Sequence, residues 1–294
     1  MQLTAKVPPR PRSARVVADR RVTLVAAAIP LVFLLVFYVA PIGQLVVVGF
    51  EEKNGPTLKY YQKIWSNSYY VDAFISTILI ALAVAITCLV LGYLAAYYLA
   101  RSRSSLLRSI LFITVLSPLL TSVIVRTYGW LVLLAPNGAV AKLWQAVLPT
   151  NPPQMLYNLP AAYVATVHVL LPFAILPLSA GISGLSRNLE TASESLGASR
   201  MRTFVKVTLP LTLPSIAVSV TLVFVLAMGI YVTPLVVGGT SVPLAGIRVY
   251  QEVFGLNDYP TASALGFSLL GLTFICTALL TLIFSRARRW VRVD

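Results

Sequence analysis

Six apolar runs separated by polar segments organise this chain of 294 residues. They cover approximately residues 22–48, 74–100, 107–134, 161–185, 211–237 and 262–284. Each run is long enough to cross about 30 Å of hydrocarbon as a helix. None shows the short alternation of apolar and polar residues that is typical of a membrane barrel. The pattern therefore predicts an all-α membrane protein with six transmembrane helices.

The composition supports a chain that lies mostly in a bilayer. Hydrophobic residues make up 58% of it and charged residues only 11%, and the mean hydropathy is +0.84. A soluble domain has about 25% charged residues. The net charge of +14 is compatible with a nucleic-acid partner or with the excess of Lys and Arg on the cytoplasmic side of membrane proteins, and the distribution of charge decides between them.

Most basic residues fall in alternate connecting segments. If the N-terminus is inside, the inner segments hold 17 of the 23 Lys and Arg residues. These are Lys6, Arg10, Arg12, Arg15, Arg20, Arg21, Arg101, Arg103, Arg108, Arg187, Arg200, Arg202, Lys206, Arg286, Arg288, Arg289 and Arg292. The asymmetry predicts that both termini and the 186–210 loop are cytoplasmic. It accounts for the basic excess without nucleic acid.

The 186–210 loop is the most clearly patterned polar segment. It predicts two short helices, with Asn188 as an N-cap and Glu190 in a first turn, where the helix dipole favours an anion. Gly197 suits a position of positive φ after the first helix, and Pro210 precedes the next membrane segment. A solvated cytoplasmic loop without a partner is the alternative interpretation.

The residue spacing in this loop resembles the E-A-A, x3, G, x9, I-x-L-P signature of binding-protein-dependent ABC importer permeases, the MetI-like inner-membrane subunits. Ala192, Gly197, Leu209 and Pro210 match the signature. Thr191 stands in place of its Glu, Ser193 in place of its second Ala, and Val207 in place of its Ile. Glu190, one residue before the motif position, is a candidate replacement for the missing Glu.

The resemblance implies that the loop forms a coupling helix seated in a groove of a separate ATPase. The residues expected to couple the two proteins are Glu190, Thr191, Ala192, Ser193, Glu194, Gly197, Leu209 and Pro210. It also implies a core of five helices with the first helix packed outside. The implied partners are an ABC ATPase dimer that binds ATP and Mg, a second permease subunit in a heterodimer, and an extracytoplasmic solute-binding protein.

These expectations give a multi-pass protein of the inner membrane. They divide the chain into a cytoplasmic tail (1–21), a permease domain (22–285) and a second cytoplasmic tail (286–294). Arg20-Arg21 before the first run is also compatible with a twin-arginine export signal, but positive charge that anchors the first helix inside is the ordinary interpretation. Cys88 and Cys276 lie within apolar runs and are expected to be unpaired packing residues.

Few polar side chains in the spanning runs are candidates for the translocation pathway. His168 is the single His of the chain, and a lone membrane His commonly forms an inter-helix hydrogen bond. Arg126 either extends to the interface among aromatic residues or faces a vestibule. Pro234 predicts a broken fifth helix that lines a cavity, with an ordinary kink as the alternative. The candidate pathway residues are Arg126, Tyr128, Trp130, His168, Tyr231, Thr233 and Pro234.

Residues 92–101, 125–130 and 231–234 also resemble the spermidine/putrescine-type branch of this permease family. Some members have an acidic residue where this chain has Ile230, and the spans contain no central carboxylate that would pair with a polyamine. The resemblance implies a small organic solute such as a polyamine.

The leading hypothesis is a non-catalytic permease subunit with no cofactor or metal of its own. The sequence lacks a G-x-x-x-x-G-K-[ST] loop, so ATP hydrolysis is assigned to a partner chain. A self-sufficient secondary transporter is the alternative, although such carriers usually need acidic or His relays at membrane depth. A membrane enzyme is a third hypothesis, and the absence of clustered carboxylates, His residues or a nucleophile–base pair opposes it.

Overall fold

The computed structural model describes residues 28–52, 55–148 and 150–289, the side chains of 52 and 287–289 excepted. The predicted N-terminal tail 1–21, with Arg20-Arg21, lies outside the described residues, and so does most of the predicted C-terminal tail. The chain forms two compact units, residues 1–48 and 49–294.

The described part of the first unit is one apolar helix. Residues Ala28–Phe50 form a helix long and apolar enough to cross a membrane, which extends into the start of the second unit. Within it lie the π-helical turn η1 (Leu35–Val39) and α2 (Ala40–Phe50). The π turn precedes Pro41, which has no N–H to donate to the carbonyl of Phe37.

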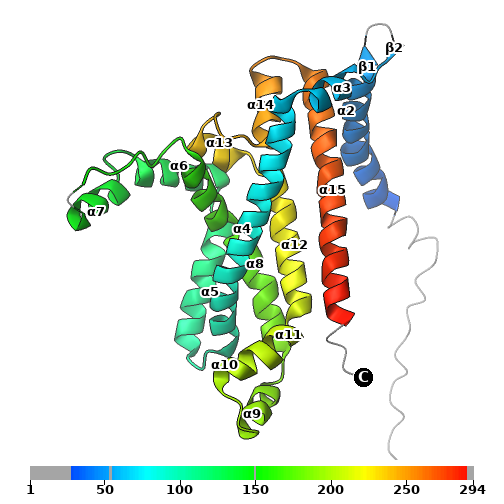
Figure 1. Ribbon diagram of the computed structural model, residues 1–294. Helices are drawn as coiled ribbons and strands as arrows, with labels where there is room; N and C mark the ends of the chain where they lie inside the picture. The colour runs from blue at the N-terminus through cyan, green and yellow to red at the C-terminus, as the bar shows by residue number, and fades with distance from the viewer. Residues whose placement is uncertain (1–27, 53–54, 149, 290–294) are drawn as a thin grey trace, which may run out of the picture. The chain divides into compact units, whose positions relative to one another are not determined.

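Helices make up almost all of the second unit (Figure 1). A two-stranded antiparallel hairpin pairs Glu51 with Pro56 at its start. The elements are β1 (Glu51–Glu52), β2 (Gly55–Pro56), α3 (Lys59–Ser66), α4 (Ser68–Arg101), α5 (Ser105–Leu120), α6 (Val123–Leu134), α7 (Ala139–Val147), α8 (Leu159–Gly184), α9 (Arg187–Ser195), α10 (Arg200–Thr203), η2 (Phe204–Thr208), α11 (Leu209–Leu211), α12 (Leu213–Gly229), α13 (Val232–Gly238), α14 (Ala245–Phe254) and α15 (Tyr259–Arg289).

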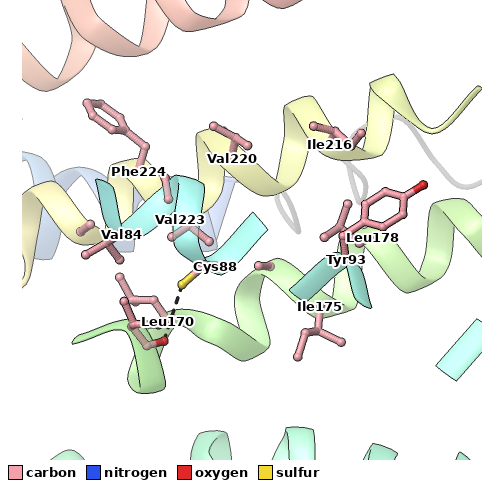
Figure 2. Packing of buried hydrophobic residues seen from close by; sticks show 14 of the residues in the cluster. Val84, Cys88, Tyr93, Leu170, Ile175, Leu178, Ile216, Val220, Val223 and Phe224 are labelled. Carbon is pink, nitrogen blue, oxygen red and sulfur yellow. Dashed lines mark hydrogen bonds between the residues drawn. The ribbon is translucent and has the colours of Figure 1, made fainter. Parts of the chain in front are cut away.

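The core of this unit lies where α4, α8 and α12 pack together (Figures 1 and 2). Buried residues follow one face of α4 at helical spacing, among them Ala81, Val84 and Cys88. The Cys88 thiol donates to the carbonyl of Val167 at 3.6 Å, the dashed line of Figure 2. Cys88 and Cys276 are both unpaired, as their positions in apolar runs predict.

The predicted all-α membrane architecture is confirmed. Among the described residues, five helices are long and apolar enough to span a membrane, and there are six if the bent pair Arg200–Leu211 and Leu213–Gly229 counts as one span. The two parts of that pair meet at 66°. Two of the predicted runs are nevertheless not continuous helices, because each is interrupted near a proline.

The predicted helix 107–134 is wrong as a single element, because it breaks between α5 and α6 at Thr121 and Ser122. Pro118 has no N–H to bond the carbonyl of Thr114, and the Ser117 hydroxyl donates to that carbonyl instead, at 3.2 Å. The Thr121 hydroxyl donates to the carbonyl of Ser117 at 2.8 Å. α5 alone is an apolar helix of 16 residues. Val123–Val147, which contains α6 and α7, is long and apolar enough to cross a membrane.

The predicted run 211–237 is also divided, into α12 and α13, as the broken-helix interpretation of Pro234 expects. The break lies four residues before the proline, at Ile230, which is extended (ψ 129°). Pro234 cannot donate to the carbonyl of residue i−4, and this is Ile230. Pro234 itself lies in the first turn of α13, where a helix needs no N–H donor.

The connecting segments opposite the 186–210 loop contain more structure than the sequence predicts. α3, α7 and α14 are short helices there, and α14 packs on α15 and α4 (Figure 1). Glu252 of α14 is buried and accepts the Tyr70 hydroxyl at 2.7 Å. The sequence did not predict this pair, because the acid and the phenol are 182 residues apart.

An ion pair connects α3 to the start of α15 at this end of the bundle. Lys63 of α3 lies 3.0 Å from Asp258, whose carboxylate also accepts the backbone N–H and the hydroxyl of Thr261 at the start of α15. Burial by itself raises the pKa of Asp258, but the hydrogen bonds from Thr261 and Lys63 outweigh burial and hold that pKa below its usual value. The contacts fix α3 to α15.

The contact between α8 and α12 generates a stability prediction. A Cβ added at Gly181 would overlap the Ser215 hydroxyl and lie 2.5 Å from its Cβ. Overpacking costs about 1–3 kcal/mol, so we expect Gly181→Ala to lower the Tm of the detergent-solubilised protein by several degrees. Gly184→Ala is the matched control, because nothing lies within 4 Å of its added Cβ. An unchanged Tm for Gly181→Ala, or no recovery on adding Ser215→Gly, would contradict close packing here.

Candidate functional site: the loop between α8 and α12

The candidate site is the polar segment that connects α8 to α12 and contains α9, α10, η2 and α11. It lies at the end of the bundle where α4 ends and α5 begins (Figure 1). Two helices with a turn between them were predicted here, and the structure confirms this arrangement.

α9 begins two residues earlier than the sequence suggests. Ser186 is the N-cap, with an extended ψ of 128°, and its hydroxyl accepts the N–H of Asn188 at 3.3 Å. The prediction that Asn188 is the cap is therefore wrong: it lies inside the first turn, where its N–H is one of the donors to be capped. Glu190 does lie in the first turn, as predicted.

Gly197 ends α9 with the positive φ that was predicted for it, +87°. Its N–H donates to the carbonyl of Glu194 at 2.9 Å, and the next N–H, of Ala198, donates to Ser193 at 3.2 Å. This pair of bonds is a Schellman motif, which satisfies the last carbonyls of the helix. The turn leaves the side chain of Leu196 88% exposed.

α10 continues toward the membrane through the π turn η2. Ser199 caps α10 by accepting the N–H of Arg202, and the Ser193 and Thr203 hydroxyls, 3.0 Å apart, join α9 to α10. η2 precedes Pro210, which cannot donate to the carbonyl of Lys206. The loop is thus a compact folded unit.

A polar network fixes the loop to the membrane helices. Arg101, the last residue of α4, donates to Glu190 at 3.0 Å and to the carbonyl of Leu185 at 3.2 Å. The same Glu190 oxygen accepts the Thr208 hydroxyl at 3.1 Å. Arg187 in turn donates to the carbonyl of Arg101. The sequence did not predict roles for Arg101 and Thr208, because neither lies at a motif position.

The predicted coupling residues divide into an exposed and a packed group. Thr191, Ala192, Glu194 and Gly197 are exposed. Leu189, Ala192 and Leu196 lie at helical spacing on one side of α9, and Met201 of α10 adds a fourth exposed group. The packed group comprises Glu190, Ser193, Leu209 and Pro210, each half-buried, and Leu209 contacts the main core.

The predicted pathway residues lie mostly around α6, α8 and α13, and α13 packs on both α6 and α8. Trp130 donates to His168 at 3.4 Å, so His168 forms an inter-helix hydrogen bond, as the ordinary interpretation of a lone membrane His predicts. Thr233 is buried, and its hydroxyl lies 3.3 Å from that of Thr127, a residue not predicted to belong here.

The aromatic members of the pathway set are more exposed. Tyr128 is 61% exposed and Tyr231 is 39% exposed. Tyr231 stacks on Tyr250 of α14, with ring centroids 6.3 Å apart and planes 29° from parallel. Tyr250 was not predicted, because it lies in a segment interpreted as a loop.

Arg126 binds the end of α5. Its guanidinium donates to the carbonyl of Pro118 and, at 2.8 Å, to the carbonyl of Thr121. Because α5 stops at Leu120, these carbonyls lack the N–H partners of a continuing helix. Arg126 therefore bridges the break between α5 and α6.

Comparison with known proteins places the chain among membrane transport components. Residues 88–289 match the family model described as "Binding-protein-dependent transport system inner membrane component". The chain is 31% identical over 235 residues to the spermidine/putrescine transport system permease protein PotB of Salmonella typhimurium (strain SL1344), covering 79% of each chain. It is 29% identical over 273 residues to PotB of Haemophilus influenzae (strain ATCC 51907 / DSM 11121 / KW20 / Rd), covering 90% of this chain and 93% of that one.

A solved structure shares the fold. A chain of a bacterial alginate ABC transporter, in complex with an alginate pentasaccharide-bound periplasmic protein, superposes with a TM-score of 0.74. The match covers 92% of this chain and 96% of that one, at 16% sequence identity.

The role of Arg126 at the helix break is testable. Arg126→Met leaves the carbonyls of Pro118 and Thr121 without a donor, and a hydrogen bond to a charged group contributes about 1.5–3 kcal/mol. We expect Arg126→Met to lower the Tm of the detergent-solubilised protein. The Tm of Arg126→Lys should lie between those of Arg126→Met and wild type. Arg103→Met is the control, because Arg103 is exposed beyond the end of α4. Equal Tm values for Arg126→Met and Arg103→Met would contradict the bridging role.

Proposed function

Because the chain belongs to the family of binding-protein-dependent transport system inner membrane components, we propose that it forms part of the pathway of a polyamine importer driven by a partner ATPase. It is a permease subunit of the ABC importer class, located in the inner membrane, and is not itself an enzyme. The observation that carries the coupling part of the proposal is the folded α9–α11 loop with its exposed apolar stripe.

We assign the loop to the cytoplasmic side, and its charge supports this assignment. The end of the bundle that contains α9 carries basic residues from α9 itself, from the adjoining ends of α4 and α5, from α10 and η2, and from the end of α15. These are Arg101, Arg103, Arg108, Arg187, Arg200, Arg202, Lys206 and Arg286. The bias of Lys and Arg toward cytoplasmic loops supports this orientation. In it, the loop faces the compartment that contains ATP.

The stripe of Leu189, Ala192 and Leu196 on α9 is the proposed docking surface for the ATPase. Leu196 is 88% exposed and Met201 is 71% exposed, outside the membrane-spanning part of the chain. Exposed apolar groups on a rigid helix are typical of a helix that lies in the groove of a partner. Ala192, at the centre of the stripe, has a small side chain that lets the groove approach closely.

The remaining partners follow from the family and its relatives. We assign the opposite face, with α3, α7 and α14, to an extracytoplasmic solute-binding protein, as the periplasmic protein in the alginate transporter complex supports by analogy. A second permease subunit completes the pathway. α5 has no buried residue within this chain, which supports its packing against that subunit. ATP and Mg belong to the ATPase.

The polyamine assignment rests on the PotB relatives and on the aromatic character of the predicted pathway. Tyr128, Trp130 and Tyr231 offer ring faces that attract ammonium groups. Ile230, beside Tyr231, provides no carboxylate. We therefore assign the counter-charge for a polyamine to the second permease subunit, and this chain supplies aromatic and hydroxyl contacts.

Docking is tested by changing the exposed stripe. We expect Leu196→Asp to reduce the ATPase that copurifies with the permease by tenfold or more, because a carboxylate is costly to bury in an apolar groove. Leu256→Asp is the matched control, since Leu256 is 69% exposed at the opposite end of the bundle. If Leu196→Asp retains the ATPase as well as the control does, the docking surface is misplaced.

Substrate class is tested by uptake into proteoliposomes that contain the full importer. We expect ATP-dependent uptake of labelled spermidine or putrescine, suppressed by excess of the other polyamine and not by an uncharged sugar. Uptake driven by a proton gradient without ATP would favour the secondary transporter. ATP-dependent uptake that no polyamine competes with would leave the importer class intact and contradict the substrate.

A further inference from the structure

One carboxylate of α9 contacts the end of α4 and the segment that leads into α12. The Oε1 atom of Glu190 accepts both the guanidinium of Arg101 at 3.0 Å and the hydroxyl of Thr208 at 3.1 Å. Arg101 ends α4, and Thr208 ends η2, which leads through α11 into α12. Glu190, on α9, therefore touches the end of the core helix α4 and the segment that leads into the core helix α12.

The surroundings of this contact favour a rigid link. The side chains of Arg101 and Glu190 are 11% and 20% exposed, and Thr208 is 1% exposed. Salt and water screen such a pair much less than they screen a surface ion pair. Breaking it would leave a charged group with little access to water, which is strongly unfavourable. The contact is thus expected to persist while α9 moves.

Arg101 extends the link to a third helix. Its guanidinium also donates to the carbonyl of Leu185, the C-cap of α8, and its own carbonyl accepts the guanidinium of Arg187 at the start of α9. Glu190 and Arg101 together connect α9 with the ends of α4 and α8 and the entry to α12. These three are the helices that form the core.

The orientation of Glu190 separates it from the docking surface. Glu190 and Ser193 are half-buried and bonded within the chain, whereas Leu189, Ala192 and Leu196 are exposed. The family signature has a Glu where this chain has Thr191. A Glu that contacts the ATPase at that position is not replaced by Glu190. The Glu190 carboxylate is already engaged within the permease.

We propose that Glu190, held by Arg101 and Thr208, is the positioning residue that transmits movement of the ATPase-docked helix α9 to α4 and α12. The inference rests on the proposed function, because it takes α9 as the docked element. Without the link, α9 follows the ATPase while the membrane helices do not. ATP hydrolysis then continues, and the solute is not carried.

The test compares two charge-removing substitutions at this end of the bundle. Glu190→Gln removes the charge with little change in size, and Arg103→Gln is the control, because Arg103 is exposed beyond the end of α4 and outside the loop. Each variant is purified with the ATPase and reconstituted with the other importer subunits. Copurified ATPase, ATP hydrolysis and spermidine uptake are measured on the same preparation.

We expect Glu190→Gln to keep the ATPase bound and hydrolysing while uptake per ATP falls about tenfold, the order expected for loss of a charge-assisted hydrogen bond. Arg103→Gln should match wild type. Thr208→Val, which removes one donor and keeps the ion pair, should give a smaller loss in the same direction. A purely structural role would reduce hydrolysis and uptake together.

Three outcomes overturn the inference. The first is that Glu190→Gln is as well coupled as Arg103→Gln, and the second is that it loses the ATPase from the complex, as a docking residue would. If Glu190→Gln fails to accumulate in the membrane, the charge exchange Arg101→Glu/Glu190→Arg is measured in its place. Recovered accumulation and uptake in this double variant support the link, and no recovery is the third outcome that contradicts it. Failure of wild type to take up solute with ATP would instead refute the proposed function.

Discussion

The constraint on which this structure depends is that a backbone carbonyl in a membrane protein must find a donor within the protein. A continuous helix meets this requirement by itself, but proline removes one donor at a time. At Pro118 the side chain of Ser117 and the guanidinium of Arg126 supply the missing donors for the last turns of α5. The places where the chain leaves the helical pattern are thus the places where polar side chains lie.

The same requirement explains where bends are located. α12 ends at Gly229, before Ile230, whose carbonyl would face Pro234, and the bend at the entry to α12 lies at Thr212, between Pro210 and Pro214. Between these two points α12 is a regular helix packed on α4 and α8. A straight, densely packed middle with interrupted ends suits a subunit whose ends change conformation while its core stays intact.

The cost of unpaired polar groups in the membrane also explains where the charged residues lie. Within the described core helices, the Asp, Glu, Lys and Arg residues lie near the ends, and the ion pair of Arg101 with Glu190, less exposed than that of Lys63 with Asp258, lies where α4 meets the loop. A buried ion pair is a poor source of net stability but a strict determinant of geometry, because either partner alone is unfavourable. Such a pair suits a link between elements better than it suits a stabilising contact.

The sequence alone determined the all-α membrane class, the approximate runs and the two-helix loop, because apolar length and proline and glycine positions act locally. It placed Glu190 in a first turn and gave Gly197 its positive φ. It did not determine that Ser186 caps α9, that Arg126 turns back to α5, or that α14 forms between two membrane helices. Only the tertiary structure decided the partners of Glu190, because Arg101 lies 89 residues away and hydropathy does not encode such a contact. Which face of α9 is bound within the chain, and which is free for another protein, follows from that contact.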